Sequence, residues 1–178
     1  MNVVLIGFRC AGKSTVGKAL ANRLVRPFVD CDDYIEQKTH LTIREIFDLA
    51  GESYFRTLEG QAIADLSRLD GHILATGGGA ILKRQNTKYL KRNGLFVLLD
   101  VTPDTAFQRI AGDPATRTRR PALTDFDPLT EIHEQMTLRQ PYYREAADCV
   151  VRTDHRPVEE VVGEILAFLQ GRGLIPPP

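Results

Sequence analysis

Short apolar runs alternate with amphipathic patterns along this chain. Runs rich in β-branched residues predict strands, and apolar positions recurring every three or four residues predict helices with one face on a core. The predicted strands are Asn2 to Ile6, Pro27 to Val29, His72 to Ala75, Leu95 to Leu99 and Cys149 to Arg152. The predicted helices are Lys13 to Leu24, Asp32 to Lys38, Ile43 to Leu69, Arg84 to Arg92, Pro103 to Ala111 and about Leu129 to Ala146.

Glycine and proline refine this pattern at two places. We expect the helix over Ile43 to Leu69 to break near Gly51, because glycine is unfavourable inside a helix. A last helix is predicted after Arg156, with Pro157 in its first turn. Strands that alternate with helices predict an α/β fold in which helices cover both faces of a parallel sheet. Ligands of such folds gather at the carboxyl ends of the strands.

Composition narrows the class of protein. The 178 residues, of which 43% are hydrophobic, predict a single domain over residues 1–178. Because 23 basic residues balance 23 acidic ones, no net charge attracts the chain to nucleic acid or to an anionic membrane. The start of the chain lacks a signal peptide or an apolar span, so we expect a soluble, cytoplasmic protein. Cys10, Cys31 and Cys149 lack metal-site spacing and are expected to stay reduced.

The most informative stretch is "VVLIGFRCAGKSTVGKAL" near the start of the chain. Gly7, Gly12, Lys13 and Ser14 fit the phosphate-binding pattern G-x-x-x-x-G-K-[ST], between a predicted strand and a predicted helix. Such a loop points its amides at phosphate oxygens, while the lysine neutralises the β- and γ-phosphates and the hydroxyl binds Mg²⁺. The alternative is a glycine-rich turn with a solvated lysine. The context favours nucleotide binding.

Two carboxylates follow the second predicted strand in "FVDCDDYIE". Asp30 and Asp32 are spaced so that one can face a metal ion while the other faces a hydroxyl nucleophile. The same residues are also typical of a helix start, with Asp32 as the N-cap and Asp33 near the positive end of the helix dipole. The spacing alone does not separate these interpretations.

Arg56 and Glu59 lie three residues apart on a predicted helix whose core face carries Phe55, Leu58 and Ala62. This spacing is typical of a surface ion pair, which is the simpler interpretation. The alternative is a guanidinium that a carboxylate holds in place to bind an anionic substrate.

Three consecutive glycines, Gly77, Gly78 and Gly79, follow the third predicted strand in "ATGGGAIL". Because consecutive glycines weaken strands and helices, they indicate a backbone that approaches another group closely. At the carboxyl end of a strand this group is expected to be a ligand, and a tight loop without a ligand is the alternative.

Arginines dominate the segment 112–124, "GDPATRTRRPALT", which has no periodic pattern. Arg117, Arg119 and Arg120 favour a mobile lid that closes over a γ-phosphate and excludes water. A solvated loop or a nucleic-acid contact is less favoured, because no aromatic residues are interleaved. Arg120 precedes Pro121, which restricts its backbone. Further on, Arg139 in "LRQPYYREAA" is either a second anion-binding group or a surface charge on a helix.

Six stretches in this order resemble the shikimate kinase family over about residues 2–169: "GFRCAGKSTVGKALA", "DCDDYIE", "FRTLEG", "TGGGAI", "RRPAL" and "LRQPYYREAA". The resemblance implies the three-layer P-loop kinase fold, with a parallel five-stranded sheet in the order 2-3-1-4-5 and a mobile lid. It also implies transfer of the γ-phosphate of ATP to the 3-hydroxyl of shikimate, in aromatic amino-acid biosynthesis. We expect shikimate and ATP as small-molecule partners, Mg²⁺ as cofactor, and a monomer that binds neither nucleic acid nor membrane.

The resemblance also implies roles for individual residues, within a substrate-binding helical region at about 32–60. The implied catalytic residues are Lys13, Asp32 as the proposed base, and Arg120. ATP is expected to contact Gly7, Ala11, Gly12, Lys13, Ser14, Thr15, Arg109 near adenine, and Arg120 in the lid. Shikimate is expected to contact Asp32, Arg56, Gly77, Gly78, Gly79 and Arg139, with Glu59 orienting Arg56. Ser14 and Asp30 correspond to the Mg²⁺ site.

Two departures from the family pattern bear on these expectations. Many members have glycine at the position of Cys10, so Cys10 must take a backbone conformation compatible with a Cβ. The extra arginines Arg117 and Arg119 make the assignment of the key lid residue to Arg120 less direct. A sugar-acid kinase such as a gluconate kinase, and a sensing module that binds an aromatic acid without turnover, remain as alternative functions.

Overall fold

The computed structural model describes residues 1–112 and 127–176, and its elements follow the predicted alternation. The strands are β1 (Asn2–Ile6), β2 (Phe28–Asp30), β3 (Ile73–Ala75), β4 (Gly94–Asp100) and β5 (Cys149–Arg152). The helices are α1 (Lys13–Leu24), α2 (Cys31–Thr39), α3 (Ile43–Leu66), α4 (Arg84–Lys91), α5 (Pro103–Gly112), α7 (Pro128–Ala146) and α8 (Val158–Gly171), together with the short 3₁₀ helix η1 (Ala80–Leu82).

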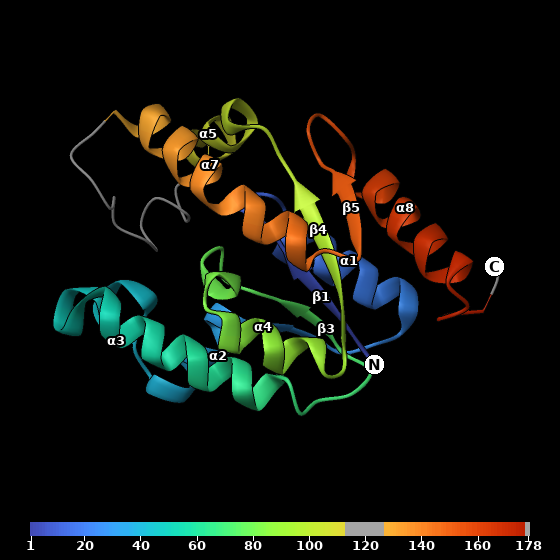
Figure 1. The fold of residues 1–178 in the computed structure, drawn as a ribbon, viewed down its shortest axis with the longest axis horizontal. Helices are drawn as coiled ribbons and strands as arrows, with labels where there is room; N and C mark the ends of the chain where they lie inside the picture. The colour runs from blue at the N-terminus through green and yellow to red at the C-terminus, as the bar shows by residue number, and fades with distance from the viewer. Residues whose placement is uncertain (113–126, 177–178) are drawn as a thin grey trace.

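All five strands form one parallel sheet in the order β2-β3-β1-β4-β5, which confirms the predicted order (Figure 1). The central strand β1 pairs with β3 on one side, where Leu5 lies opposite Ala75, and with β4 on the other, where Leu5 lies opposite Val97. Every residue of β1 is buried, as expected for a strand that is covered on both faces.

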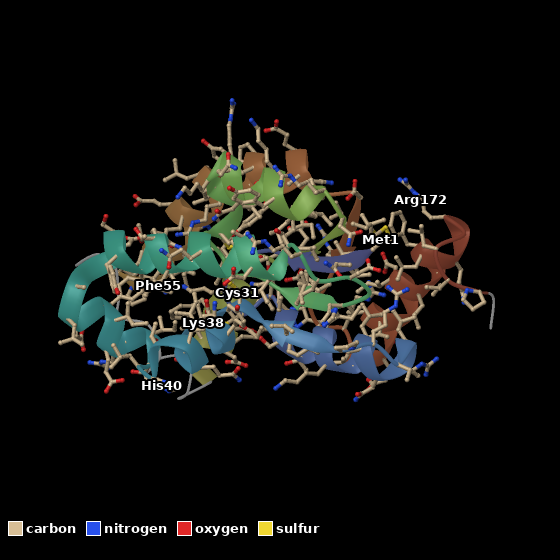
Figure 2. All side chains as sticks on the ribbon, turned by 90° about the horizontal axis from the view of Figure 1, so that it is seen from below. Met1, Cys31, Lys38, His40, Phe55 and Arg172 are labelled. Atoms are coloured by element: carbon tan, nitrogen blue, oxygen red, sulfur yellow. The ribbon has the colours of Figure 1, made fainter. Side chains whose placement is uncertain are left out.

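Helices cover both faces of this sheet. α1 contacts β3 and α8, and α8 contacts β5, whereas α4 and α7 both pack on β4. In Figure 2 the green α4 and the orange α7 lie above the sheet, and the blue α1 lies below it. The predicted three-layer arrangement is therefore confirmed. Within residues 1–112 and 127–176, no helix is long and apolar enough to cross a membrane.

Most element boundaries lie within one or two residues of the predicted ones. Helix α3 ends at Leu66, three residues earlier than predicted, and its expected interruption is present at Gly51, where φ is 75° and ψ is 178°. Pro157 precedes α8 as its N-cap instead of lying in its first turn. Of the predicted lid, Gly112 is the last residue of α5, and residues 113–124 lie outside the described part of the chain.

The helical region beside β2 is held by caps and aromatic packing. Thr42 caps α3 in a capping box with Glu45, so both ends of this short turn are hydrogen-bonded. On the predicted core face of α3, Phe55 is fully buried and its ring centroid lies 4.9 Å from that of Phe47. Phe47 precedes the break at Gly51 and Phe55 follows it, so this packing joins the two parts of α3, which contacts α2 and α4.

The turn between β1 and α1 requires unusual backbone conformations. Gly7 has φ 139°, and a Cβ there would lie 2.5 Å from the backbone oxygen of Leu99. Gly12 has φ 96° and caps α1. Cys10 also lies in the left-handed region, with φ 61°. This region is allowed for a residue with a Cβ, as expected for Cys10, but it costs such a residue about 1–2 kcal/mol.

Gly94 gives a test of packing at the start of β4. An added Cβ would lie 2.5 Å from the Leu90 backbone oxygen and 2.8 Å from Val4 Cγ2. We therefore expect Gly94→Ala to lower the free energy of unfolding by about 1–3 kcal/mol. The matched control is Gly163→Ala in α8, where no atom lies within 4 Å and helix propensity predicts a gain of up to ~1 kcal/mol. Urea titrations giving equal changes for both variants would contradict this account.

Cys10 gives a second test, because two substitutions at one position have opposite expected effects. Cys10→Gly removes the Cβ from a left-handed residue, so stability should be kept or raised by up to ~1 kcal/mol. Cys10→Val places a β-branched side chain at the same φ and should lower stability by at least ~1 kcal/mol. Thermal unfolding of both variants measures the difference. Equal melting temperatures would show that the turn relaxes freely.

Candidate active site

A cavity of about 1120 Å³ opens at the carboxyl ends of the strands. This volume exceeds the ~300–1,000 Å³ of a site for one drug-sized ligand, so it can hold a nucleotide and a second small molecule. Its lining includes most of the predicted nucleotide and metal residues, together with part of the predicted substrate site: Ala11, Gly12, Lys13, Ser14, Thr15, Asp30, Asp32, Gly77, Gly78 and Arg109.

The loop between β1 and α1 forms one wall of the cavity. The Lys13 ammonium donates hydrogen bonds to the backbone oxygens of Gly7 at 2.8 Å and Phe8 at 2.7 Å. These bonds keep the buried ammonium at the loop, next to the N-terminus of α1. Since the first amides of a helix have no acceptor within the helix, this end of α1 offers donors and positive potential to a phosphate.

Arg109, on α5, connects this loop to the end of β5. Its Nη1 donates to the Cys10 backbone oxygen at 3.1 Å and to Thr153 Oγ1 at 3.2 Å, and its Nη2 donates to the Thr153 backbone oxygen. Arg109 lines the cavity, as a residue near a bound nucleotide must. The sequence did not predict its contact with Cys10, because the two residues lie 99 positions apart.

At the end of β2, Asp30 is the N-cap of α2. Its Oδ1 accepts a hydrogen bond from the Asp32 backbone N–H at 2.9 Å, and its Oδ2 accepts one from Ser14 Oγ at 2.6 Å. The alternative interpretation in which Asp32 is the N-cap is therefore wrong. Because Asp30 caps the helix, the Asp32 side chain is left to line the cavity.

The Ser14 and Asp30 oxygens fit a magnesium ion. Burial raises the pKa of Asp30 above its ordinary value, and the charges of Asp32 and Asp33 add to this effect, while the Ser14 hydrogen bond opposes it. A cation would relieve this crowding of negative charge. Among the described residues no group of three or more His, Cys, Asp or Glu side chains could hold a metal. Mg²⁺ needs only one or two protein oxygens, because waters and phosphates complete its shell.

The three glycines after β3 separate this cavity from two arginines. A Cβ on Gly79 would lie 2.7 Å from Arg56 Nη1, and a Cβ on Gly78 would lie 3.7 Å from Arg139 Nη1. Of the predicted site residues that the structure describes, five do not line the cavity itself: Gly7, Arg56, Glu59, Gly79 and Arg139. The close approach inferred from the glycines is present, and a protein guanidinium accounts for it at Gly79.

Arg56 is held by two carboxylates. Its Nη1 donates to Glu59 Oε2 at 3.0 Å, as the spacing suggested, and its Nε and Nη2 donate to Glu52 Oε1 at 3.1 and 2.8 Å. Although burial opposes the charge, Glu59 and Glu52 together raise the pKa of Arg56 above its ordinary value. Glu59 is itself buried, so the pair is not the surface ion pair of the simpler interpretation. Sequence reasoning missed Glu52, although its i, i+4 spacing to Arg56 was a signal.

A polar stripe on α7 faces the two loops. It consists of Glu131, Gln135, Arg139 and Tyr143, which are spaced by four residues and so share one side of the helix. Gln135 donates to Glu131 Oε1 at 2.8 Å, and Tyr143 donates to the Gly78 backbone oxygen. Of these four residues only Arg139 was predicted from the sequence, although the regular spacing could have revealed the stripe.

Two arginines of the site pack against one aromatic ring. Arg9 Nη2 lies 3.2 Å from the buried Glu131 carboxylate, and its guanidinium carbon is 5.7 Å from the centroid of the Phe8 ring. The Arg139 guanidinium carbon is 5.6 Å from the same centroid. Arg9 and Glu131 were missed because they are 122 residues apart. Arg120, the predicted lid residue, lies outside the described residues.

Comparisons with known proteins agree with this site. A sequence model described as "Shikimate kinase" matches residues 9–170. The chain is 40% identical to the shikimate kinase of Symbiobacterium thermophilum over 97% of its own length and 98% of that protein. It is 44% identical to that of Pseudomonas syringae pv. syringae, over 94% of its length and 95% of the relative.

Solved structures give the same result. A shikimate kinase from Acinetobacter baumannii in complex with shikimate has a TM-score of 0.90 and 36% identity, covering 98% of this chain and 95% of that one. A gluconokinase from Sinorhizobium meliloti has a TM-score of 0.61 at 18% identity, with 96% of this chain and 92% of that one covered, which shows a shared fold only. The phosphate-binding loop, the paired aspartates and these full-length matches together place the chain in the shikimate kinase family.

Proposed function

We propose that this enzyme transfers the γ-phosphate of ATP to the 3-hydroxyl of shikimate, with Mg²⁺ held by Ser14 and Asp30. ATP-dependent phosphorylation of shikimate is the activity of its family, so the proposal concerns the acceptor oxygen, the metal and the residues. The observation that carries it is the single wall formed by the phosphate-binding loop, the Ser14–Asp30 pair and Asp32. We further propose that residues 1–178 form a single domain and that the protein is a cytoplasmic monomer. Cys10, Cys31 and Cys149 are free thiols in the structure.

In this proposal the donor side of the cavity stabilises negative charge. The loop amides and the N-terminus of α1 bind the β-phosphate, and Lys13 exchanges its bonds to Gly7 and Phe8 for phosphate oxygens. Bound Mg²⁺ would neutralise phosphate oxygens as charge moves to the leaving group. Arg109 keeps the loop in place through the Cys10 carbonyl. Arg120 supplies a further positive charge from the lid.

The acceptor side positions a hydroxyl. Asp32 accepts a hydrogen bond from the reacting hydroxyl of shikimate, directs its oxygen at the γ-phosphorus, and can receive its proton. The Gly78 amide offers a backbone donor, and Gly77 and Gly79 complete the glycine-rich wall. Arg56, which lies next to Gly79, and Arg139, which lies next to Gly78, bind the shikimate carboxylate, with Glu59 orienting Arg56.

A coupled assay of ADP release tests the function directly. Turnover of ATP should depend on shikimate and should be absent with gluconate, which would be the acceptor if the gluconate kinase alternative held. A module that senses an aromatic acid would bind shikimate without releasing ADP. No feature of the described residues favours either alternative, since the likeness to the gluconokinase extends only to the fold.

The proposed binding of the shikimate carboxylate is tested by removing the guanidinium of Arg56 or of Arg139. Arg56→Ala and Arg139→Ala should each weaken shikimate binding by about 10- to 150-fold, because a charge-assisted hydrogen bond contributes ~1.5–3 kcal/mol. Nucleotide affinity should change less than about twofold, since Arg56 and Arg139 do not line the nucleotide cavity. Arg44→Ala, which removes an exposed arginine from α3, is the matched control for calorimetric titration. Unchanged shikimate affinity in both variants would remove these residues from the site.

Kinetic measurements should distinguish the roles of Asp30 and Asp32. Asp32→Asn keeps the shape of the side chain but cannot accept a proton, so kcat should fall by about 10²–10⁴-fold while nucleotide affinity is largely retained. Asp30→Asn should instead raise the Mg²⁺ concentration needed for half-maximal rate. Asp33→Asn, on the same helix but outside the cavity lining, serves as the control. Near-normal turnover of Asp32→Asn would leave that carboxylate without a catalytic role.

A further inference from the structure

The Arg56 guanidinium has protein partners at three of its N–H groups before a substrate arrives. Glu59 accepts a hydrogen bond from Nη1, and Glu52 accepts hydrogen bonds from both Nε and Nη2. Gly79 lies against the guanidinium plane, where an added Cβ would lie 2.9 Å from the guanidinium carbon. The edge formed by Nε and Nη2 is one that binds a carboxylate through two parallel hydrogen bonds. In this structure a carboxylate of the protein itself, that of Glu52, holds this edge.

The two carboxylates differ in how easily they can leave. The Glu59 side chain is only 2% exposed, so separating it from Arg56 would leave a buried charge without its partner, at high cost. The Glu52 side chain is 49% exposed and can rotate into water, where an ion pair of this kind contributes little. Glu59 is therefore the fixed partner of Arg56, and Glu52 is the exchangeable one.

The break in α3 gives Glu52 a second favourable position. Gly51 has non-helical dihedral angles, so Glu52 is the first residue of the helical segment that follows it. A carboxylate in the first turn of a helix is stabilised by the positive end of the dipole. Glu52 keeps this stabilisation after it leaves Arg56, which lowers the cost of its release.

We propose that Glu52 is a specificity-determining residue that competes with the substrate carboxylate for Arg56. The proposal rests on the proposed function, in which Arg56 binds that carboxylate. An arriving carboxylate that binds the Nε–Nη2 edge must replace Glu52, because Glu52 already accepts both hydrogen bonds of that edge. A neutral analogue does not compete for this edge, so Glu52 lowers the affinity for charged acids alone and thereby narrows the preference of the site for acids over neutral analogues.

The test uses conservative substitutions of the two carboxylates in the whole chain, with shikimate binding measured by calorimetry. E52Q removes the competing charge and should tighten shikimate binding by about two- to fivefold, the scale of an exposed ion pair. E59Q removes the orienting charge and should weaken binding. The methyl ester of shikimate, which lacks the charge, should bind E52Q and the unaltered protein equally.

Matched controls separate the possible outcomes. D48N removes the carboxylate of another exposed i, i+4 ion pair on α3, between Arg44 and Asp48, and should leave shikimate affinity unchanged. Unchanged or weaker binding of shikimate to E52Q, or an equal gain for the ester, overturns the proposal. Weaker binding to R56A together with no gain in E52Q would overturn this inference alone. Unchanged shikimate binding to R56A would show that Arg56 does not bind the substrate carboxylate. E52Q decides the matter even if E59Q does not fold.

Discussion

The close approach of two loops at the centre of the sheet is the constraint on which the site depends. β1 and β3 are parallel neighbours with Leu5 opposite Ala75, so their carboxyl ends lie at one level. Thr76 extends this pairing, since both its backbone N–H and its hydroxyl donate to the Leu5 oxygen at 3.2 Å. Immediately beyond, a Cβ on Gly78 would lie 3.3 Å from the Arg9 backbone nitrogen. The phosphate-binding loop and the glycine-rich loop therefore meet side by side, as the proposed transfer from ATP to shikimate requires.

Charge is arranged around these loops so that each group is held before substrates bind. Glu131 holds Arg9, Glu59 holds Arg56, and Asp30 holds Ser14, in each case through a contact of 3.2 Å or less. Groups fixed in this way need little reorganisation when charge develops in the reaction, which is the basis of electrostatic stabilisation. The same contacts explain why several carboxylates can be buried here.

Features that depend on short spacing could be predicted from the sequence, and features that depend on the fold could not. The phosphate-binding loop and the Arg56–Glu59 contact each lie within one turn or loop, so residue types and spacing sufficed to predict them, whereas the burial of Glu59 depends on the fold. The sequence predicted Asp30 as a metal ligand and offered Asp32 as the N-cap of α2, whereas Asp30 is the N-cap. Two aspartates that lie two residues apart at a helix start are equally good N-cap candidates by residue type. The contact of Arg109 with Cys10 arises only when α5 folds against the first loop.

The energetics of the phosphate-binding loop show why such a fold-dependent contact matters. The left-handed conformation of Cys10 costs about 1–2 kcal/mol relative to an ordinary one. The Arg109 hydrogen bond to the Cys10 carbonyl is charge-assisted, a class that contributes ~1.5–3 kcal/mol. The two magnitudes are comparable, so a single contact from α5 offsets the strain of a residue with a Cβ at this position. The loop can therefore keep its cysteine where the turn alone would favour glycine, because its conformation is set by α5 and β5 as well as by its own sequence.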